Sequence, residues 1–89
     1  MIEVAFSSSF KKAFKRKIKH NPLKEKLFYI KLETFSLNPF SSPLKTHKLS
    51  GKQKHLWSFS IEYDLRVIFY FDSPKRVVFI NIGTHEEDY

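Results

Sequence analysis

Hydrophobic and polar positions change their period several times along the chain, and each change marks an expected element. The apolar residues Ile2, Val4 and Phe6 alternate with their neighbours, which predicts a short strand with one buried face. Helical spacing follows from the serines at 7–9, whose hydroxyls suit an N-cap, to about Lys19. The apolar side of this stretch is formed by Phe10, Ala13, Phe14 and Ile18. Lysines and one arginine fill the other side, so the sequence predicts a basic, amphipathic first helix.

A second helix is expected directly after the first. Asn21 and Pro22 break the first helix, and Pro22 also suits the first turn of the next, which we expect to run to about Leu37. This second helix carries two apolar stripes, Leu23, Leu27 and Ile30 on one and Phe28, Leu32 and Phe35 on the other. Two stripes predict that one packs on a sheet while the other meets the first helix or a partner.

The remainder of the chain predicts a long connector followed by three strands. Residues 38–56 are rich in Pro, Ser and Lys and show no clear period, and connectors of this length are usually functional or disordered. Strands are expected at about 56–62, 65–71 and 76–82, and their short connections predict an antiparallel meander. Both alternating sets of side chains in 65–71 are mainly apolar, as in a central strand covered on one face by helices.

Composition favours one compact domain that spans residues 1–89. Ten phenylalanines, within an aromatic content of 17%, supply the large buried areas that a small core needs. The absence of cysteine excludes disulfides, a thiolate nucleophile and cysteine-based metal sites, and it fits a reducing cytoplasm. No membrane span or signal peptide is evident, so we expect a soluble, unexported protein. The expected fold is α+β, in the order β-α-α-β-β-β, with an antiparallel-dominated twisted sheet and both helices on one face.

Charge narrows the choice of partner. The formal net charge is +7 and the pI is about 9.7, which for so small a body implies a strong positive field and an anionic partner. The basic residues concentrate in 11–19 and 45–54, whereas Glu86, Glu87 and Asp88 make the end of the chain acidic. This polarised distribution predicts a binding surface on one side of the molecule.

Polar groups that could move protons or neutralise phosphate lie at the ends of, or inside, the apolar strands of the last third. These are Asp64, Arg66 and His85. A charge buried without a partner is costly, so Arg66 requires either an anionic ligand or a nearby carboxylate such as Glu62.

Three segments, together with the order of elements, resemble the RelE toxin superfamily. They are Thr46-His-Lys-Leu-Ser-Gly51, Ile61-Glu-Tyr-Asp-Leu-Arg-Val-Ile-Phe-Tyr70 and Gly83-Thr-His85. The resemblance covers nearly the whole chain and is strongest to the YafQ type. It implies a RelE-like domain and a type II toxin-antitoxin module. In such a module the toxin enters the ribosomal A site and cuts mRNA, and a small antitoxin wraps the toxin to silence it.

The YafQ pattern assigns candidate catalytic positions. Its loop His, its turn Asp, the His of Gly-Thr-His and a terminal aromatic four residues later fall on His47, Asp64, His85 and Tyr89. A further catalytic His of the YafQ type corresponds to Ser60 here, so that role is vacant or has moved. Arg66 is similar to the transition-state Arg of RelE and YoeB-type members, so the chain combines two patterns.

Cleavage of RNA through its own 2′-OH needs a base, an acid and cations for the phosphate, and it requires no metal or other cofactor. Either His47 or His85 could be the base with the other as the acid, and we favour His85 as a direct participant. Asp64 could orient a His or accept a proton, while Arg66 supplies a fixed cation. Tyr89 could stack on a base or hold a ribose. The expected contacts to RNA phosphates or ribosomal RNA are Lys45, Lys48, Lys52 and Lys54.

Structural explanations of the same residues stay open at this point. His47 could be a solvated surface residue, Asp64 a turn former, and Arg66 the partner of Glu62 in an ion pair. A metal site from His47, Asp64 and His85 has no supporting ligand spacing. Two other functions share the fold: a ParE-type toxin that inhibits DNA gyrase by binding, and an RNA-binding module without catalysis. The substitution at Ser60 keeps the last alternative open.

Overall fold

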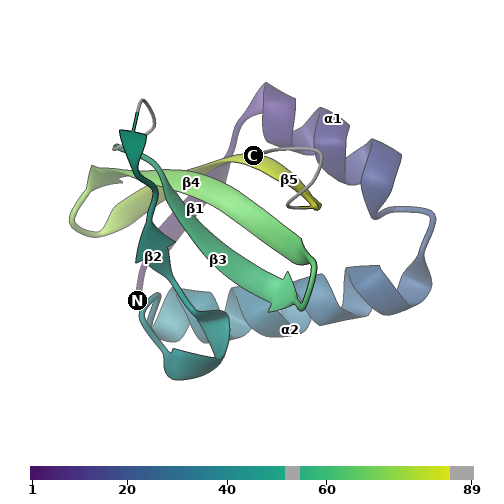
Figure 1. Ribbon diagram of the computed structural model, residues 1–89, viewed down its shortest axis with the longest axis horizontal. Helices are drawn as coiled ribbons and strands as arrows, with labels where there is room; N and C mark the ends of the chain where they lie inside the picture. Colours follow the sequence, from purple (N-terminus) through teal and green to yellow (C-terminus); the bar gives the residue numbers. More distant parts are fainter. Residues whose placement is uncertain (52–54, 85–89) are drawn as a thin grey trace.

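The computed structural model describes residues 1–51 and 55–84. The elements, in chain order, are β1 (Glu3–Phe6), α1 (Ser8–Lys17), α2 (Pro22–Leu37), the 3-10 helix η1 (Ser42–Leu44), β2 (His47–Lys48), β3 (Trp57–Glu62), β4 (Leu65–Ser73) and β5 (Arg76–Thr84) (Figure 1). All five strands form one sheet in the order β1-β5-β4-β3-β2. The expected α+β order of two helices followed by a meander is confirmed. The short elements η1 and β2, within the connector, were not predicted.

Sheet pairing is antiparallel except at one edge. β1 runs parallel to β5, with Val4 opposite Val77. The neighbours β5 and β4, β4 and β3, and β3 and β2 are all antiparallel. β4 is therefore the middle strand, as its apolar alternating sets predicted.

Both helices begin where the sequence provides a side-chain cap. Ser7 Oγ accepts a hydrogen bond from the Phe10 backbone N–H at the start of α1, and Asn21 Oδ1 accepts one from the Lys24 N–H at the start of α2. Pro22 occupies the first turn of α2, where its missing N–H costs nothing. Neither described helix is long and apolar enough to cross a membrane.

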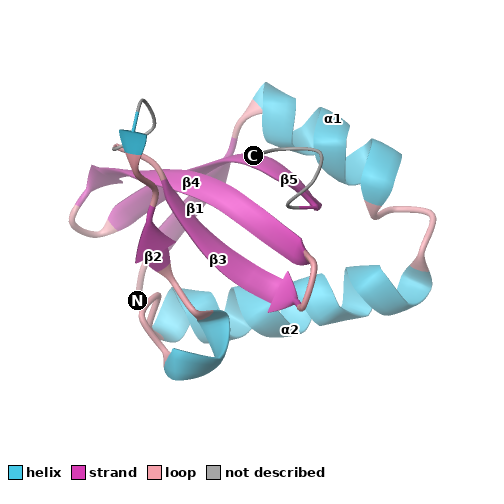
Figure 2. Ribbon diagram, in the orientation of Figure 1, coloured by secondary structure: helices cyan, strands magenta, loops and turns pink. Residues whose placement is uncertain are grey.

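Figure 2 shows the two helices packed beside the sheet. Phenylalanine rings from both helices and from β3, β4 and β5 meet in the core, together with aliphatic side chains. Phe35 of α2 stacks on Phe59 of β3, with ring centroids 4.6 Å apart, and meets Phe69 and Phe79 edge-on. Phe10 of α1 contacts the same Phe79 at 5.4 Å. Because one ring from each of β3, β4 and β5 meets Phe35, α1 and α2 cover the same face of the sheet.

The opposite side of the sheet, here called the open face, carries different chemistry. Side chains alternate along a strand, so the neighbours of Phe59 on β3, Ser58 and Ser60, point to the open face. Directly opposed residues of antiparallel strands share a face, which places Arg66 there beside Ser60. His47 of β2 joins this face because it pairs with Ser58. The sheet therefore carries a row of polar side chains on the face away from its helices, although Ser58 and Ser60 in this row are buried.

Candidate active site

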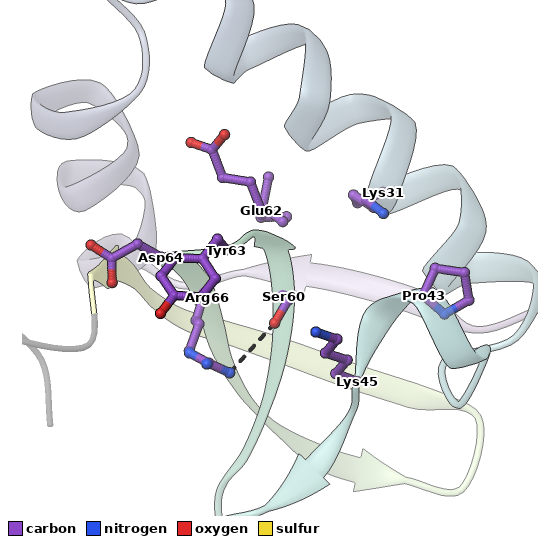
Figure 3. Close-up of a pocket in the computed structure, with 9 residues that line it drawn as sticks. Lys31, Pro43, Lys45, Ser60, Glu62, Tyr63, Asp64 and Arg66 are labelled. Atoms are coloured by element: carbon purple, nitrogen blue, oxygen red, sulfur yellow. Dashed lines mark hydrogen bonds between the residues drawn. The ribbon is translucent and has the colours of Figure 1, made fainter.

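A pocket of about 560 Å³ lies at the edge of β3, where the strand passes α2 and the segment after η1 (Figure 3). Its volume falls in the range of about 300–1,000 Å³ that is usual for ligand sites. The described residues that line it are Lys31, Pro43, Lys45, Ser60, Ile61, Glu62, Tyr63, Asp64 and Arg66.

Local backbone geometry opens this pocket. Lys45 follows η1 with φ of 52°, a left-handed conformation that changes the direction of the chain. His47 Nδ1 is hydrogen-bonded to the carbonyl oxygen of Lys45 at 2.9 Å, which ties the turn to β2. The register of β2 on β3 reaches only as far as Ser58. Because the chain has left the edge of β3 at this point, the edge beside Ser60 is open to the pocket.

Arg66 supplies the central cation of the site. Its Nη1 donates a hydrogen bond to Ser60 Oγ at 3.4 Å, while its buried Nε has no hydrogen-bond partner within residues 1–51 and 55–84. A buried donor left unsatisfied costs about 1–3 kcal/mol, so an incoming acceptor would be favoured at this atom.

An ion pair between Arg66 and Glu62 was one expected alternative, and it is wrong. The carboxylate of Glu62 binds the ammonium of Lys24 at 2.5 Å, which ties the end of β3 to the start of α2. Within the described part of the chain, no carboxylate pairs with Arg66. The guanidinium therefore keeps its charge available for a ligand.

Ser60 lies between two cations. Its side chain is only 8% exposed and sits on the open face directly across the ladder from Arg66. Figure 3 shows the Lys45 ammonium directed toward the Ser60 hydroxyl from the other side. An anion that binds here would meet two positive charges and one hydroxyl group, all of which can donate hydrogen bonds.

The pocket collects some of the predicted residues and leaves others out. Asp64 lies in the exposed turn between β3 and β4 and lines the pocket. His47 is exposed on the open face, where it lies opposite Ser58 of β3. It does not line the pocket. Lys48 pairs with Trp57 and so points to the opposite side of the sheet from His47. The predicted residues Lys52, Lys54, His85 and Tyr89 lie outside the described residues.

Lys31 belongs to the site and was missed by sequence reasoning. It lies on α2 seven residues after Lys24, two helical turns along the same side of the helix. The spacing of these two lysines is only a weak signal, because the fold alone shows that this side of α2 faces the pocket. Across residues 1–51 and 55–84, no three His, Asp or Glu side chains lie together as a metal-binding group.

Comparison with known proteins places the chain in a recognised group. Residues 2–87 match the family model described as the bacterial toxin of type II toxin-antitoxin system, YafQ. A search of curated proteins finds no match.

Three solved structures illustrate the shared fold. A metal-bound toxin from Helicobacter pylori has a TM-score of 0.80 at 22% identity, with 100% of both chains covered. A YoeB/ParE toxin from Agrobacterium tumefaciens has a TM-score of 0.77 at 16% identity, over 94% of this chain and 99% of the other. The DinJ-YafQ toxin-antitoxin complex from E. coli has a TM-score of 0.72 at 23% identity, over 99% and 97%. At these identities the likeness shows the fold alone.

Proposed function

Because the chain belongs to the YafQ family of bacterial type II toxins, we propose that it is a ribosome-dependent mRNA endonuclease. One observation carries the proposal. The half-buried guanidinium of Arg66 lines an open pocket, has no carboxylate partner among the described residues, and keeps a buried Nε without an acceptor. A phosphodiester oxygen has the charge and the acceptor geometry that this group lacks.

The reaction needs only groups that the chain can supply. A base removes the proton of the RNA 2′-OH, and the 2′-oxygen attacks the adjacent phosphorus. The bond from phosphorus to the 5′-oxygen breaks, and an acid protonates that oxygen as it leaves. The products are a 2′,3′-cyclic phosphate and a free 5′-OH. Negative charge grows on the phosphate oxygens during the attack, and Arg66 and Lys45 would stabilise it from opposite sides of Ser60.

Proton transfer falls to the histidines in this proposal. His85 follows β5 in the sequence, and β5 is the strand that pairs with β4 beside Arg66. His47 lies on the open face opposite Ser58, and in the proposal one of the two histidines would serve as the acid and the other as the base. Asp64 at the rim would orient a His or accept a proton, and Tyr89 would stack on a base or hold a ribose.

The partners follow from charge and family. Lys45, together with Lys48, Lys52 and Lys54, would bind phosphates of mRNA in the A site or of ribosomal RNA. A cognate antitoxin would silence the toxin in the cytoplasm. The E. coli DinJ-YafQ complex is a toxin-antitoxin complex with this fold, which supports a protein partner of that kind.

Primer extension on mRNA incubated with programmed ribosomes tests the proposal. The wild type should give discrete A-site cuts that are absent on naked RNA and are lost in Arg66→Gln. Arg16→Gln is a matched control, because Arg16 is exposed on α1 and carries the same charge. A wild type that arrests growth without cutting mRNA would overturn the proposal and favour a ParE-like inhibitor of gyrase.

A further inference from the structure

The pocket does not end at Ser60. It continues past the edge of β3 to the side facing α2, where Lys31, Pro43 and Ile61 line it. Figure 3 shows Lys31 across β3 from Arg66, with Pro43 on the same side. The cavity therefore connects the cations Arg66 and Lys45 near Ser60 with the cation Lys31 on α2.

On the helix side of the pocket, Lys31 is a cation without an ion-pair partner among the described residues. The nearby carboxylate of Glu62 is already bound by Lys24 at 2.5 Å. The carboxylate of Asp64, at the other end of the lining, is directed away from Lys31 in Figure 3. Lys31 is half-buried, and none of the ion pairs found among the described residues includes it. An anion that enters the pocket would interact favourably with this ammonium, because charges interact more strongly at a partly buried site than in bulk water.

We propose that Lys31 forms a second phosphate subsite, which binds the phosphodiester next to the one that is cut. The inference rests on the proposed function, because it takes Arg66 and Lys45 as the site of the scissile phosphate. Single-stranded RNA carries one phosphate per nucleotide, so a strand cut at Arg66 must place a neighbouring phosphate one nucleotide away. The exposed ring of Pro43 gives this part of the pocket an apolar wall, which suits the carbon face of the ribose that connects the two phosphates. Lys31 would thus fix the path of the strand across the edge of β3.

Binding of a short RNA that cannot be cut separates this subsite from catalysis. The probe is a 2′-O-methyl RNA trinucleotide, which has two phosphodiesters and no free 2′-OH at either. Two further probes replace one phosphodiester at a time with an uncharged methylphosphonate. Titration is followed by NMR on isotope-labelled protein, which detects weak binding in a chain of 89 residues. The variants are Lys31→Gln, Lys31→Arg and Arg66→Gln, with Lys26→Gln as the matched control on an exposed position of α2.

Lys31→Gln should weaken binding of the fully charged probe roughly threefold to tenfold and lower its salt dependence by about 0.7 in the logarithmic slope. Lys31→Arg should retain most of the affinity, and Lys26→Gln should match the wild type. One of the two methylphosphonate probes should bind the wild type more weakly than the fully charged probe does. The same replacement should cause no further loss of affinity in Lys31→Gln. Equal thermal midpoints would show that the variants are folded.

The other outcomes separate the two ideas. If Arg66→Gln weakens binding while Lys31→Gln behaves as Lys26→Gln does, the second subsite is overturned and the nuclease proposal stands. Lys31→Gln could instead lower the affinity for every probe equally, including both methylphosphonates. The lysine would then act only through its long-range electrostatic attraction, and the subsite would again be overturned. If the trinucleotide perturbs neither Arg66 nor Ser60 in the wild type, the subsite proposal is overturned, whereas the nuclease proposal is decided by the primer-extension assay on ribosomes.

Discussion

Arg66 on β4 lies directly across the ladder from Ser60 on β3, and its guanidinium donates a hydrogen bond to the serine hydroxyl at 3.4 Å. The resemblance to the YafQ pattern leads one to expect a catalytic histidine at this serine position. Here a small hydroxyl leaves room for the guanidinium and holds one of its nitrogens. In the proposed nuclease the pair would supply a positioned cation instead of a proton-transfer group, so its expected contribution is charge stabilisation.

Removing the charge of Arg66 should slow cleavage more than it weakens binding. Arg66→Gln is expected to reduce single-turnover cleavage on programmed ribosomes about 100-fold or more, because the guanidinium acts mainly on charge that develops in the transition state. Affinity for the ribosome should stay within about twofold, since many other basic residues contribute to binding. A loss of affinity equal to the loss of rate would assign Arg66 to binding alone.

Ser60 should act through Arg66. Ser60→Ala is expected to slow cleavage by roughly threefold to tenfold, as the loss of one modest hydrogen bond implies. In the Arg66→Gln background the same change should have little further effect, because the group that it positions is gone. Rate constants for the wild type, both single variants and the double variant measure this coupling. Fully additive losses would show that Ser60 has a separate role.

His85 should be required for proton transfer. His85→Ala is expected to lower the cleavage rate about 100-fold or more and to leave ribosome binding nearly unchanged, as for the loss of a general acid or base. His20→Ala is the matched control, because His20 is exposed in the connection between α1 and α2. Cleavage that is equally fast in the two variants would remove His85 from the chemistry.

The basic segment after β2 should govern affinity for RNA. Lys52→Glu combined with Lys54→Glu is expected to weaken ribosome binding and to flatten its dependence on salt, because fewer phosphate contacts release fewer counterions. Lys11→Glu combined with Lys12→Glu makes the same charge change on α1. Equal effects of the two pairs in binding assays at several salt concentrations would mean that only the net charge matters.

Phe79 should be the costliest ring to remove from the core. It is fully buried and contacts rings from β1, α1, α2, β3 and β4. Phe79→Ala should lower the free energy of unfolding by about 3–5 kcal/mol, as large cavities in cores do. Tyr63→Ala, at a side chain that is 95% exposed, should change it by less than about 0.5 kcal/mol. Denaturant titrations of both variants check this contrast.

The parts of the fold that the sequence predicts well are those with a long, repeated pattern. Both helices carry apolar positions at helical spacing and a capping side chain, and the structure starts α2 at Pro22 and ends it at Leu37 as expected. Strand β2 has two residues and η1 has three, too few for any period to be visible. The parallel pairing of β1 with β5 is a tertiary contact between distant segments, which local patterns do not encode.

The candidate site was predictable only in part, for a related reason. Arg66 stood out because a charge within an apolar strand needs a partner. The competing partner Glu62 was excluded only by its contact with Lys24, which joins α2 to β3. Lys31 gave little local signal, since a lysine on a helix is usually solvated, and its role follows from the packing of α2 beside the pocket.

The parallel pairing of β1 with β5 also fixes when the domain can be completed during synthesis. The first strand to be made, Glu3–Phe6, finds its partner in Arg76–Phe79, near the other end of the chain. Phe79, whose ring packs against both helices, belongs to the same segment and is therefore synthesised with it. A nascent chain therefore cannot close its sheet or its core until the last strand has left the ribosome. Until β5 has been made, the ribosome carries a toxin whose sheet and core are incomplete.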